Sequence, residues 1–156
     1  MFQKRFTLET DTTADMGFEL LAIHSPSESF FLAYKLNSVL NALFVNATEK
    51  KHFNSDEPCF CRFLWQPTSG QESWELIANH YWFKEQNKHN TTLFAVAVEK
   101  KQSLLPALSR VDYFLKLPEN TLTAQNLSKI QTLNEVDYVY EITEPKIKLN
   151  PNLIFE

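Results

Sequence analysis

Two groups of residues have side chains that could perform acid–base or nucleophilic chemistry. In the first, Asp112 and Tyr113 are adjacent, and burial can shift the pKa values of an aspartate and a tyrosine until they act as base and acid. However, residues 111–117 have the composition of a β-strand, and adjacent strand residues point to opposite faces. We therefore expect Asp112 to accept hydrogen bonds from backbone or hydroxyl groups, and we do not expect the pair to form one catalytic site.

The second group consists of His24, Ser25 and Ser27, which follow a predicted strand and precede a predicted helix. The N–H groups at the start of a helix attract anions, so these three residues form a candidate ligand site. The alternative is that His24 only fixes the turn from strand to helix. A Ser-His-Asp triad with Asp112 is not expected, because the chain has no G-x-S-x-G pattern to present the serine.

The remaining chemistry-bearing residues indicate no cofactor or metal. Cys59 and Cys61 are the only two cysteines, and this spacing would strain a disulfide on a regular strand, so we expect two free thiols rather than a redox pair. The histidines at 24, 52, 80 and 89 have no paired metal-ligand spacing. Gly17 and Gly70 are the only glycines, which excludes the clustered glycines of phosphate-binding and dinucleotide-binding loops.

A strand and a helix must position the candidate ligand site. The apolar run 18–24 is typical of a strand that is buried on at least one face. The sequence Ser25-Pro26-Ser27-Glu28 matches a capping box with a proline at the first helical position. Apolar residues then recur at helical spacing, which predicts a helix over about 26–44. Residues 1–16 are interpreted as an N-terminal strand or arm.

The middle of the chain is predicted to contain an antiparallel hairpin. Its strands are 59–65 and 73–83, joined by a turn at Gly70. One face of the second strand should enter the core: Trp74, Leu76, Ala78, His80 and Trp82. On the other face, Ile77, Tyr81 and Phe83 are too apolar for full solvation and form a candidate interface with another chain.

The last third of the chain predicts two strands with a helix between them. The strands are 111–117 and 136–142, and the helix is 121–133 with an apolar stripe of Leu127, Ile130 and Leu133. Val136, Tyr138, Tyr140 and Ile142 should share one face of the final strand.

Residues 84–91 are interpreted as a polar loop and the best candidate for disorder, and 93–98 as a strand or a helical turn. The apolar ending 153–155 is expected to dock on the body. Together these elements predict a single α+β domain over 1–156, with a largely antiparallel sheet and two helices on one face.

Composition and charge restrict the function classes. The chain has 156 residues, a size typical of one domain, and 13% are aromatic. The net charge is −4, and the hairpin offers only Arg62 and Lys84 beside its aromatics, so nucleic-acid binding is not favoured. No apolar run is long enough for a membrane span, and the start lacks a secretory signal, which predicts a cytoplasmic location.

Residues 105–115 include Leu105, Pro106, Val111, Asp112 and Tyr113. This segment resembles the signature of the IPExxVDY family of uncharacterised bacterial proteins. The runs 18–24 and 31–37 and the ending 152–156 are also similar. The chain departs from the signature at Leu105, where the family has isoleucine, and at Ala107, where it has glutamate. Loss of that glutamate favours a structural role for the signature, and the resemblance implies no activity, cofactor or partner.

The leading hypothesis is therefore a non-catalytic interaction protein, a homodimer or an adaptor that uses the aromatic hairpin. A small-molecule or anion-binding protein, or an enzyme, with its site at His24 is the second hypothesis. An RNA-associated protein is the third.

Overall fold

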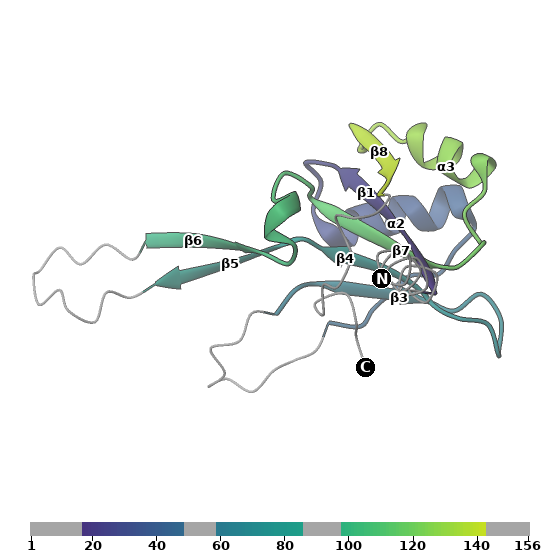
Figure 1. Ribbon diagram of the computed structural model, residues 1–156, viewed down its shortest axis with the longest axis horizontal. Helices are drawn as coiled ribbons and strands as arrows, with labels where there is room; N and C mark the ends of the chain where they lie inside the picture. The colour runs from purple at the N-terminus through teal and green to yellow at the C-terminus, as the bar shows by residue number, and fades with distance from the viewer. Residues whose placement is uncertain (1–16, 49–58, 86–97, 143–156) are drawn as a thin grey trace, which may run out of the picture.

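The computed structural model describes residues 17–48, 59–85 and 98–142, which form an α+β domain with two antiparallel sheets (Figure 1). The six-stranded main sheet has the order β2-β3-β4-β7-β1-β8, and the two-stranded sheet pairs β5 with β6. The strands are β1 (Phe18–His24), β2 (Val45–Asn46), β3 (Arg62–Trp65), β4 (Trp74–Ala78), β5 (His80–Glu85), β6 (Val98–Ser103), β7 (Tyr113–Pro118) and β8 (Tyr138–Glu141). The helices are α2 (Ser29–Leu40), α3 (Ala124–Gln131) and the short 3₁₀ helix η1 (Pro106–Leu108). The predicted fold class is confirmed.

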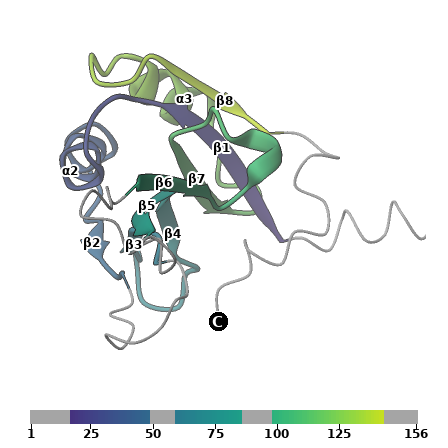
Figure 2. The same cartoon turned by 90° about the vertical axis from the view of Figure 1, so that its left-hand side faces the viewer.

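Each face of the main sheet has its own core. On one face, Leu21 and Ile23 of β1 pack with Leu32 and Leu36 of α2 and with Ile130 of α3, so both helices cover the same face, as predicted. Figure 2 shows α2 beside the sheet from the end of the molecule. The opposite face is covered by the segment around η1, which contributes part of a second cluster: Leu20, Ala22, Ile77, Leu104, Leu105, Val111, Phe114 and Ile142.

Helix α2 is shorter than predicted, and Ser25 does not cap it. The helix begins at Ser29 after Glu28, which takes an extended conformation and makes no side-chain cap bond. The reason is that the Ser25 hydroxyl is already used: it accepts a hydrogen bond from the N–H of Ser27 and donates to the carbonyl of Glu135. The helix ends at Leu40 because Asn41 adopts a left-handed conformation.

The predicted strand 73–83 is split at Asn79. Its first part, β4, pairs with β3 and confirms the hairpin, with Gly70 at a φ of +89° in the turn. Its second part, β5, leaves the main sheet and pairs with β6 instead. The prediction that Trp82 enters the core is therefore wrong, because its side chain is 58% exposed.

The final strand shows the predicted alternation, but the buried residue within it lies on the other face from the two tyrosines. Val139 of β8 is buried, whereas Tyr138 and Tyr140 are exposed. The reason is that β8 is an edge strand: Val139 faces the helix-covered core, and Ile142, just beyond the strand, packs in the second cluster on the other face. The strand predicted at 111–117 and the helix at 121–133 are confirmed as β7 and a shorter α3.

Several predictions concern residues outside the described ranges. These are the N-terminal arm 1–16, the docked ending 153–155, most of the loop 84–91 and most of the run 93–98. Of these, Lys84 and Glu85 belong to β5, and Val98 begins β6.

Candidate functional site

The connection between β1 and α2 brings together the two groups of chemistry-bearing residues. The Ser25 N–H donates to Asp112 Oδ2 at 2.9 Å, and the Ser25 hydroxyl donates to the carbonyl of Glu135. The Tyr113 hydroxyl donates to the carbonyl of Ser27. These polar groups are therefore one another's partners, and they hold the connection to the sheet.

This bonding restricts what the group can do chemically. Burial, with smaller effects from Asp112, Cys61 and Glu28, raises the pKa of Tyr113 to about 12, so its phenol stays protonated and acts as a donor. The Ser25 proton is directed at a carbonyl rather than at a base. Asp112 accepts from a backbone N–H, as predicted. These groups therefore have a structural role, which is to hold the β1–α2 connection in place.

His24 lies beside two tyrosines of β8. Its Nε2 is 3.0 Å from the Tyr140 hydroxyl, and its ring stacks on the Tyr140 ring at 5.6 Å and meets the Tyr138 ring edge-on at 6.0 Å. The backbone carbonyl of His24 accepts a hydrogen bond from the N–H of Asp137. These contacts fit the alternative in which His24 fixes the end of β1.

Asn79 is a key residue that the sequence pattern does not single out. Its side chain is fully buried; its amide donates to the carbonyls of Leu108 (2.9 Å) and Val111 (2.7 Å), and its Oδ1 accepts from the N–H of Leu105 (3.0 Å). Asn79 thus holds the signature segment, in which Leu105 and Val111 are buried and Pro106 is exposed at the start of η1. The only signal in the sequence is one polar residue inside an apolar run.

The candidate interface of the hairpin is only partly exposed. Ile77 is completely buried in the second core cluster, so it is not part of any surface that a partner could contact. Tyr81 and Phe83 are half-buried, and their rings stack at 6.0 Å. Phe60 packs edge-on against Tyr81 at 6.2 Å. The exposed aromatic residue of β5 is instead Trp82.

A larger exposed aromatic group lies on α2. We call Phe30, Phe31 and Tyr34 the α2 aromatic face; they are 63%, 40% and 65% exposed. The rings of Phe31 and Tyr34 stack at 6.4 Å. The helical periodicity of this segment predicts a helix packed on the core. It does not show which of the apolar side chains face the core and which are exposed.

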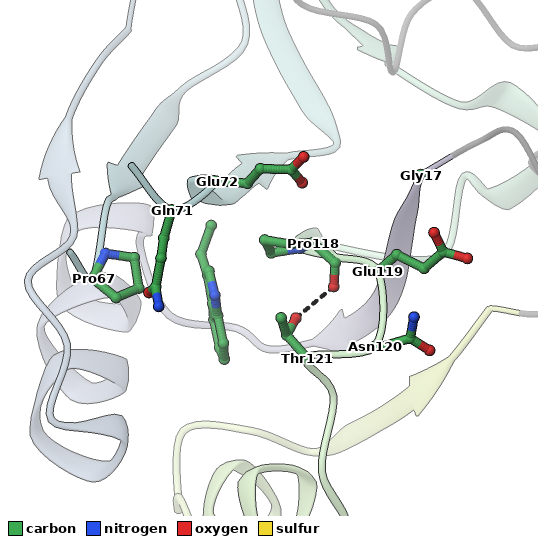
Figure 3. A pocket seen from close by; sticks show the side chains of 9 residues that line it. Gly17, Pro67, Gln71, Glu72, Pro118, Glu119, Asn120 and Thr121 are labelled. Atoms are coloured by element: carbon green, nitrogen blue, oxygen red, sulfur yellow. Dashed lines mark hydrogen bonds between the residues drawn. The ribbon is translucent and has the colours of Figure 1, made fainter. Parts of the chain in front are cut away.

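One open depression of about 470 Å³ lies at the end of the main sheet (Figure 3). Trp74 forms a wall, and the exposed Glu72 and Glu119 lie at its rim. The hydroxyl of Thr121 donates to the carbonyl of Pro118 and so closes the turn below it. These groups do not form an acid–base pair or a nucleophile with its base.

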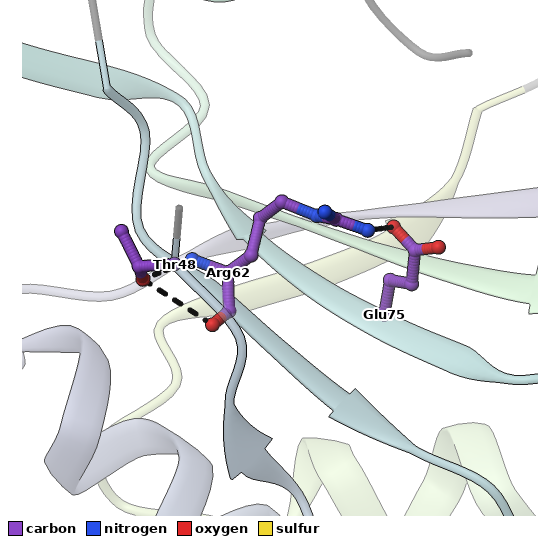
Figure 4. Close-up of polar contacts among 3 residues, drawn as sticks. All are labelled: Thr48, Arg62 and Glu75. Atoms are coloured by element: carbon purple, nitrogen blue, oxygen red, sulfur yellow. Dashed lines mark hydrogen bonds and ion pairs between the residues drawn. The ribbon is translucent and has the colours of Figure 1, made fainter. Parts of the chain in front are cut away.

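A mostly buried ion pair holds β3 against β4. Arg62 Nη2 lies 3.0 Å from Glu75 Oε2, and the N–H of Arg62 donates to the Thr48 hydroxyl at 2.9 Å (Figure 4). Because both charges bind each other across two strands, we interpret the pair as structural.

Metal and thiol chemistry receive no support from the described ranges. Cys59 is half-buried and Cys61 is exposed, and neither is in a disulfide. Among the residues that the structure describes, no three His, Cys, Asp or Glu side chains are grouped as metal ligands would be. No helix in this part of the chain is long and apolar enough to cross a membrane.

No family model, curated protein or solved structure matches the chain. The resemblance to the IPExxVDY family therefore stays a prediction from the sequence, and function must be argued from the surfaces themselves.

Proposed function

We propose that this α+β domain is a non-catalytic interaction protein that pairs with a second copy of itself through the α2 aromatic face. The observation that carries the proposal is that α2 is apolar on two opposite sides although it lies at the surface. Leu32, Ala33 and Leu36 face the core, and aromatic side chains occupy the opposite side. A helix of this kind is usually covered on both sides.

The exposed area supports a contact with another protein. At about 150–250 Å² per aromatic side chain, the exposed fractions of the α2 aromatic face leave roughly 250–400 Å² of aromatic surface in water. Apolar patches of about 300–600 Å² on a monomer are often functional. Leu43 and Val45 follow α2 in the chain and are also exposed, which adds to the apolar area that an interface of about 800 Å² per partner requires.

The charge of α2 supports a second copy as the partner. A two-fold interface places the same residues on both sides, so like charges would face each other. Lys35 is the only charged residue of α2; its ammonium lies 3.4 Å from the Glu135 carboxylate and 5.3 Å from the Phe31 ring. Because this charge is already paired, two copies can meet without repulsion.

The ligand-binding or enzymatic alternative has weaker support. The polar groups of the candidate ligand site, Ser25 and Ser27, are bonded to Asp112, Tyr113 and Glu135. A ligand would have to replace these bonds.

Sedimentation equilibrium of the wild type and of two matched variants tests the proposal. At about 50 µM, within the micromolar range in which such interfaces hold, the wild type should be a dimer. Tyr34→Asp should shift it to monomer, because two-fold symmetry would bury two carboxylates in an apolar contact. Tyr138→Asp is the control: Tyr138 is 69% exposed, similar to Tyr34, but lies on β8, and this variant should remain a dimer.

Circular dichroism must show that both variants keep the fold. A wild type that is monomeric at this concentration, or a Tyr138→Asp variant that dissociates as fully as Tyr34→Asp, contradicts the proposal.

A further inference from the structure

The β5–β6 ribbon is a second surface that the proposed dimer does not use. It departs from the main sheet at Asn79 and extends away from the body of the molecule (Figure 1). At its base, His80 Nδ1 lies 3.3 Å from the Ser103 hydroxyl. Burial and the nearby Lys101 lower the pKa of His80, although Asp112 acts in the opposite direction, so His80 is neutral at physiological pH.

The register of the ribbon brings aromatic and basic residues together. Trp82 pairs with Lys101, and Phe83 pairs with Lys100. The Lys101 ammonium lies 5.6 Å from the centre of the Trp82 ring. On the same face as Trp82, Lys84 is also exposed, and the residue opposite it on β6 is Glu99. Because Lys100 and Lys101 come from β6 and the aromatics from β5, this arrangement depends on the pairing of the two strands.

The ribbon also differs from the rest of the chain in charge. The residues of β5 and β6 (80–85 and 98–103) contain three lysines and two glutamates, a charge of +1; because the whole chain carries −4, the remainder carries −5. A projecting element with a positive charge on an acidic protein attracts anions.

We propose that the β5–β6 ribbon binds single-stranded nucleic acid without sequence preference. The ammonium groups of Lys84 and Lys101 contact phosphates, and the exposed indole of Trp82 stacks on an unpaired base. Basic side chains along the backbone path, with aromatic rings for the bases, are the means by which proteins bind single strands.

The basic neighbours of the ribbon aromatics differ from those expected from the sequence, which are Arg62 and Lys84. Arg62 is instead paired with Glu75, and the pairing of β5 with β6 supplies Lys100 and Lys101. For this one element we therefore propose nucleic-acid binding, although the sequence composition disfavours it.

Fluorescence anisotropy with labelled oligonucleotides tests the inference on the full chain. The probes are uridine and deoxythymidine oligomers of about 12 nucleotides, within the usual site sizes, in about 50 mM salt. We expect binding with a Kd on the order of 1–100 µM. Trp82→Ala should weaken it about 5- to 150-fold, the range found for loss of one stacked base, whereas Trp82→Phe should stay within a few-fold of the wild type.

Lysine variants test the charge contribution. Lys101→Gln should reduce the slope of log affinity against log salt by about 0.7, because one phosphate contact is lost. Lys129→Gln is the matched control, since Lys129 is an exposed lysine on α3, and it should leave the slope unchanged. The Tyr34→Asp variant should bind as the wild type does, which separates this inference from the proposed dimer.

Two further measurements separate base stacking from simple charge attraction. Bound oligonucleotide should quench the tryptophan fluorescence of the wild type, and this quenching should be lost in Trp82→Phe. An abasic phosphodiester of equal length and poly-glutamate should both bind more weakly than the uridine oligomer. Three results would overturn the inference: equal binding of either competitor, an unchanged affinity in Trp82→Ala, or no binding of either oligonucleotide at about 100 µM protein. Equal binding of poly-glutamate would assign the ribbon to an acidic protein partner.

Discussion

At the scale of single residues, Asn79 has the largest structural role among the polar side chains described. It is one of two buried polar residues in the described ranges, the other being Ser25. Its backbone also joins the surrounding segments, because its N–H donates to the carbonyl of Asp112 and its carbonyl accepts from the N–H of Leu104. A buried amide of this kind fixes one arrangement of the chain, since every group it bonds would otherwise lack a partner.

We expect Asn79→Leu to lower the free energy of unfolding by at least about 3 kcal/mol. The substitution leaves the Leu105 N–H and the carbonyls of Leu108 and Val111 without their partner, at about 1–3 kcal/mol for each buried group. Urea unfolding monitored by circular dichroism measures the change. Gln131→Leu, at an exposed amide of α3, is the control and should change stability by less than about 0.5 kcal/mol. A loss below about 1 kcal/mol at Asn79 would contradict this role.

At the scale of elements, the two main helices begin differently. Thr123 caps α3, because its hydroxyl accepts a hydrogen bond from the N–H of Asn126 at 3.0 Å. Glu28 occupies the same position at α2 and makes no such bond. A serine there would have the extended backbone of a capping residue and a side chain short enough to reach the first turn.

These starts predict opposite effects of two substitutions. Thr123→Ala should destabilise the protein by about 1 kcal/mol, and Glu28→Ser should stabilise it by about 0.5–1 kcal/mol. Thermal unfolding should show Tm shifts of about 2–4 °C per kcal/mol. If α2 instead began at Pro26 with Ser25 as its cap, Glu28→Ser would remove the capping-box glutamate and lower the Tm, so a decrease would contradict a helix start at Ser29.

At the scale of the whole molecule, Tyr113 links the main sheet to α2. Its ring belongs to the core beneath the helices, and its hydroxyl bonds the carbonyl of Ser27 just before α2. Ionisation of this phenol would place a charge in the core and remove the donor. The stability of the entire domain should therefore depend on this proton.

We expect the free energy of unfolding to fall as the pH rises from 10 to 12. The pKa of Tyr113 is raised in the folded state, so its contribution is fully present below the unfolded value of 10.0 and is lost as the pH rises through about 12. The slope from this residue should approach about 1.4 kcal/mol per pH unit. The measurement is the difference between wild type and Tyr113→Phe, which cancels the titration of other groups. Parallel curves for the two proteins would show that the Tyr113 proton is not linked to folding.

The types of the elements were determined by the sequence itself. The apolar run 18–24, the turn at Gly70 between apolar segments and the stripe of Leu127, Ile130 and Leu133 each predicted the correct strand, hairpin or helix. These patterns are local, because the periodicity of side chains within one element follows from the geometry of that element. The hydrogen-bonding role of Asp112 was predictable as well, because adjacent residues of a strand point to opposite faces.

The tertiary structure alone decided which partner each element took and which face it covered. Alternation along 73–83 could not show that the strand breaks at Asn79 and that its second half pairs with β6, since strand pairing joins residues that are distant in the chain. It also could not show that the tyrosines of β8 lie exposed at the edge while Val139 is buried. The two proposed surfaces, the α2 aromatic face and the β5–β6 ribbon, depend on these long-range contacts, because a side chain is exposed only where no other element of the fold covers it.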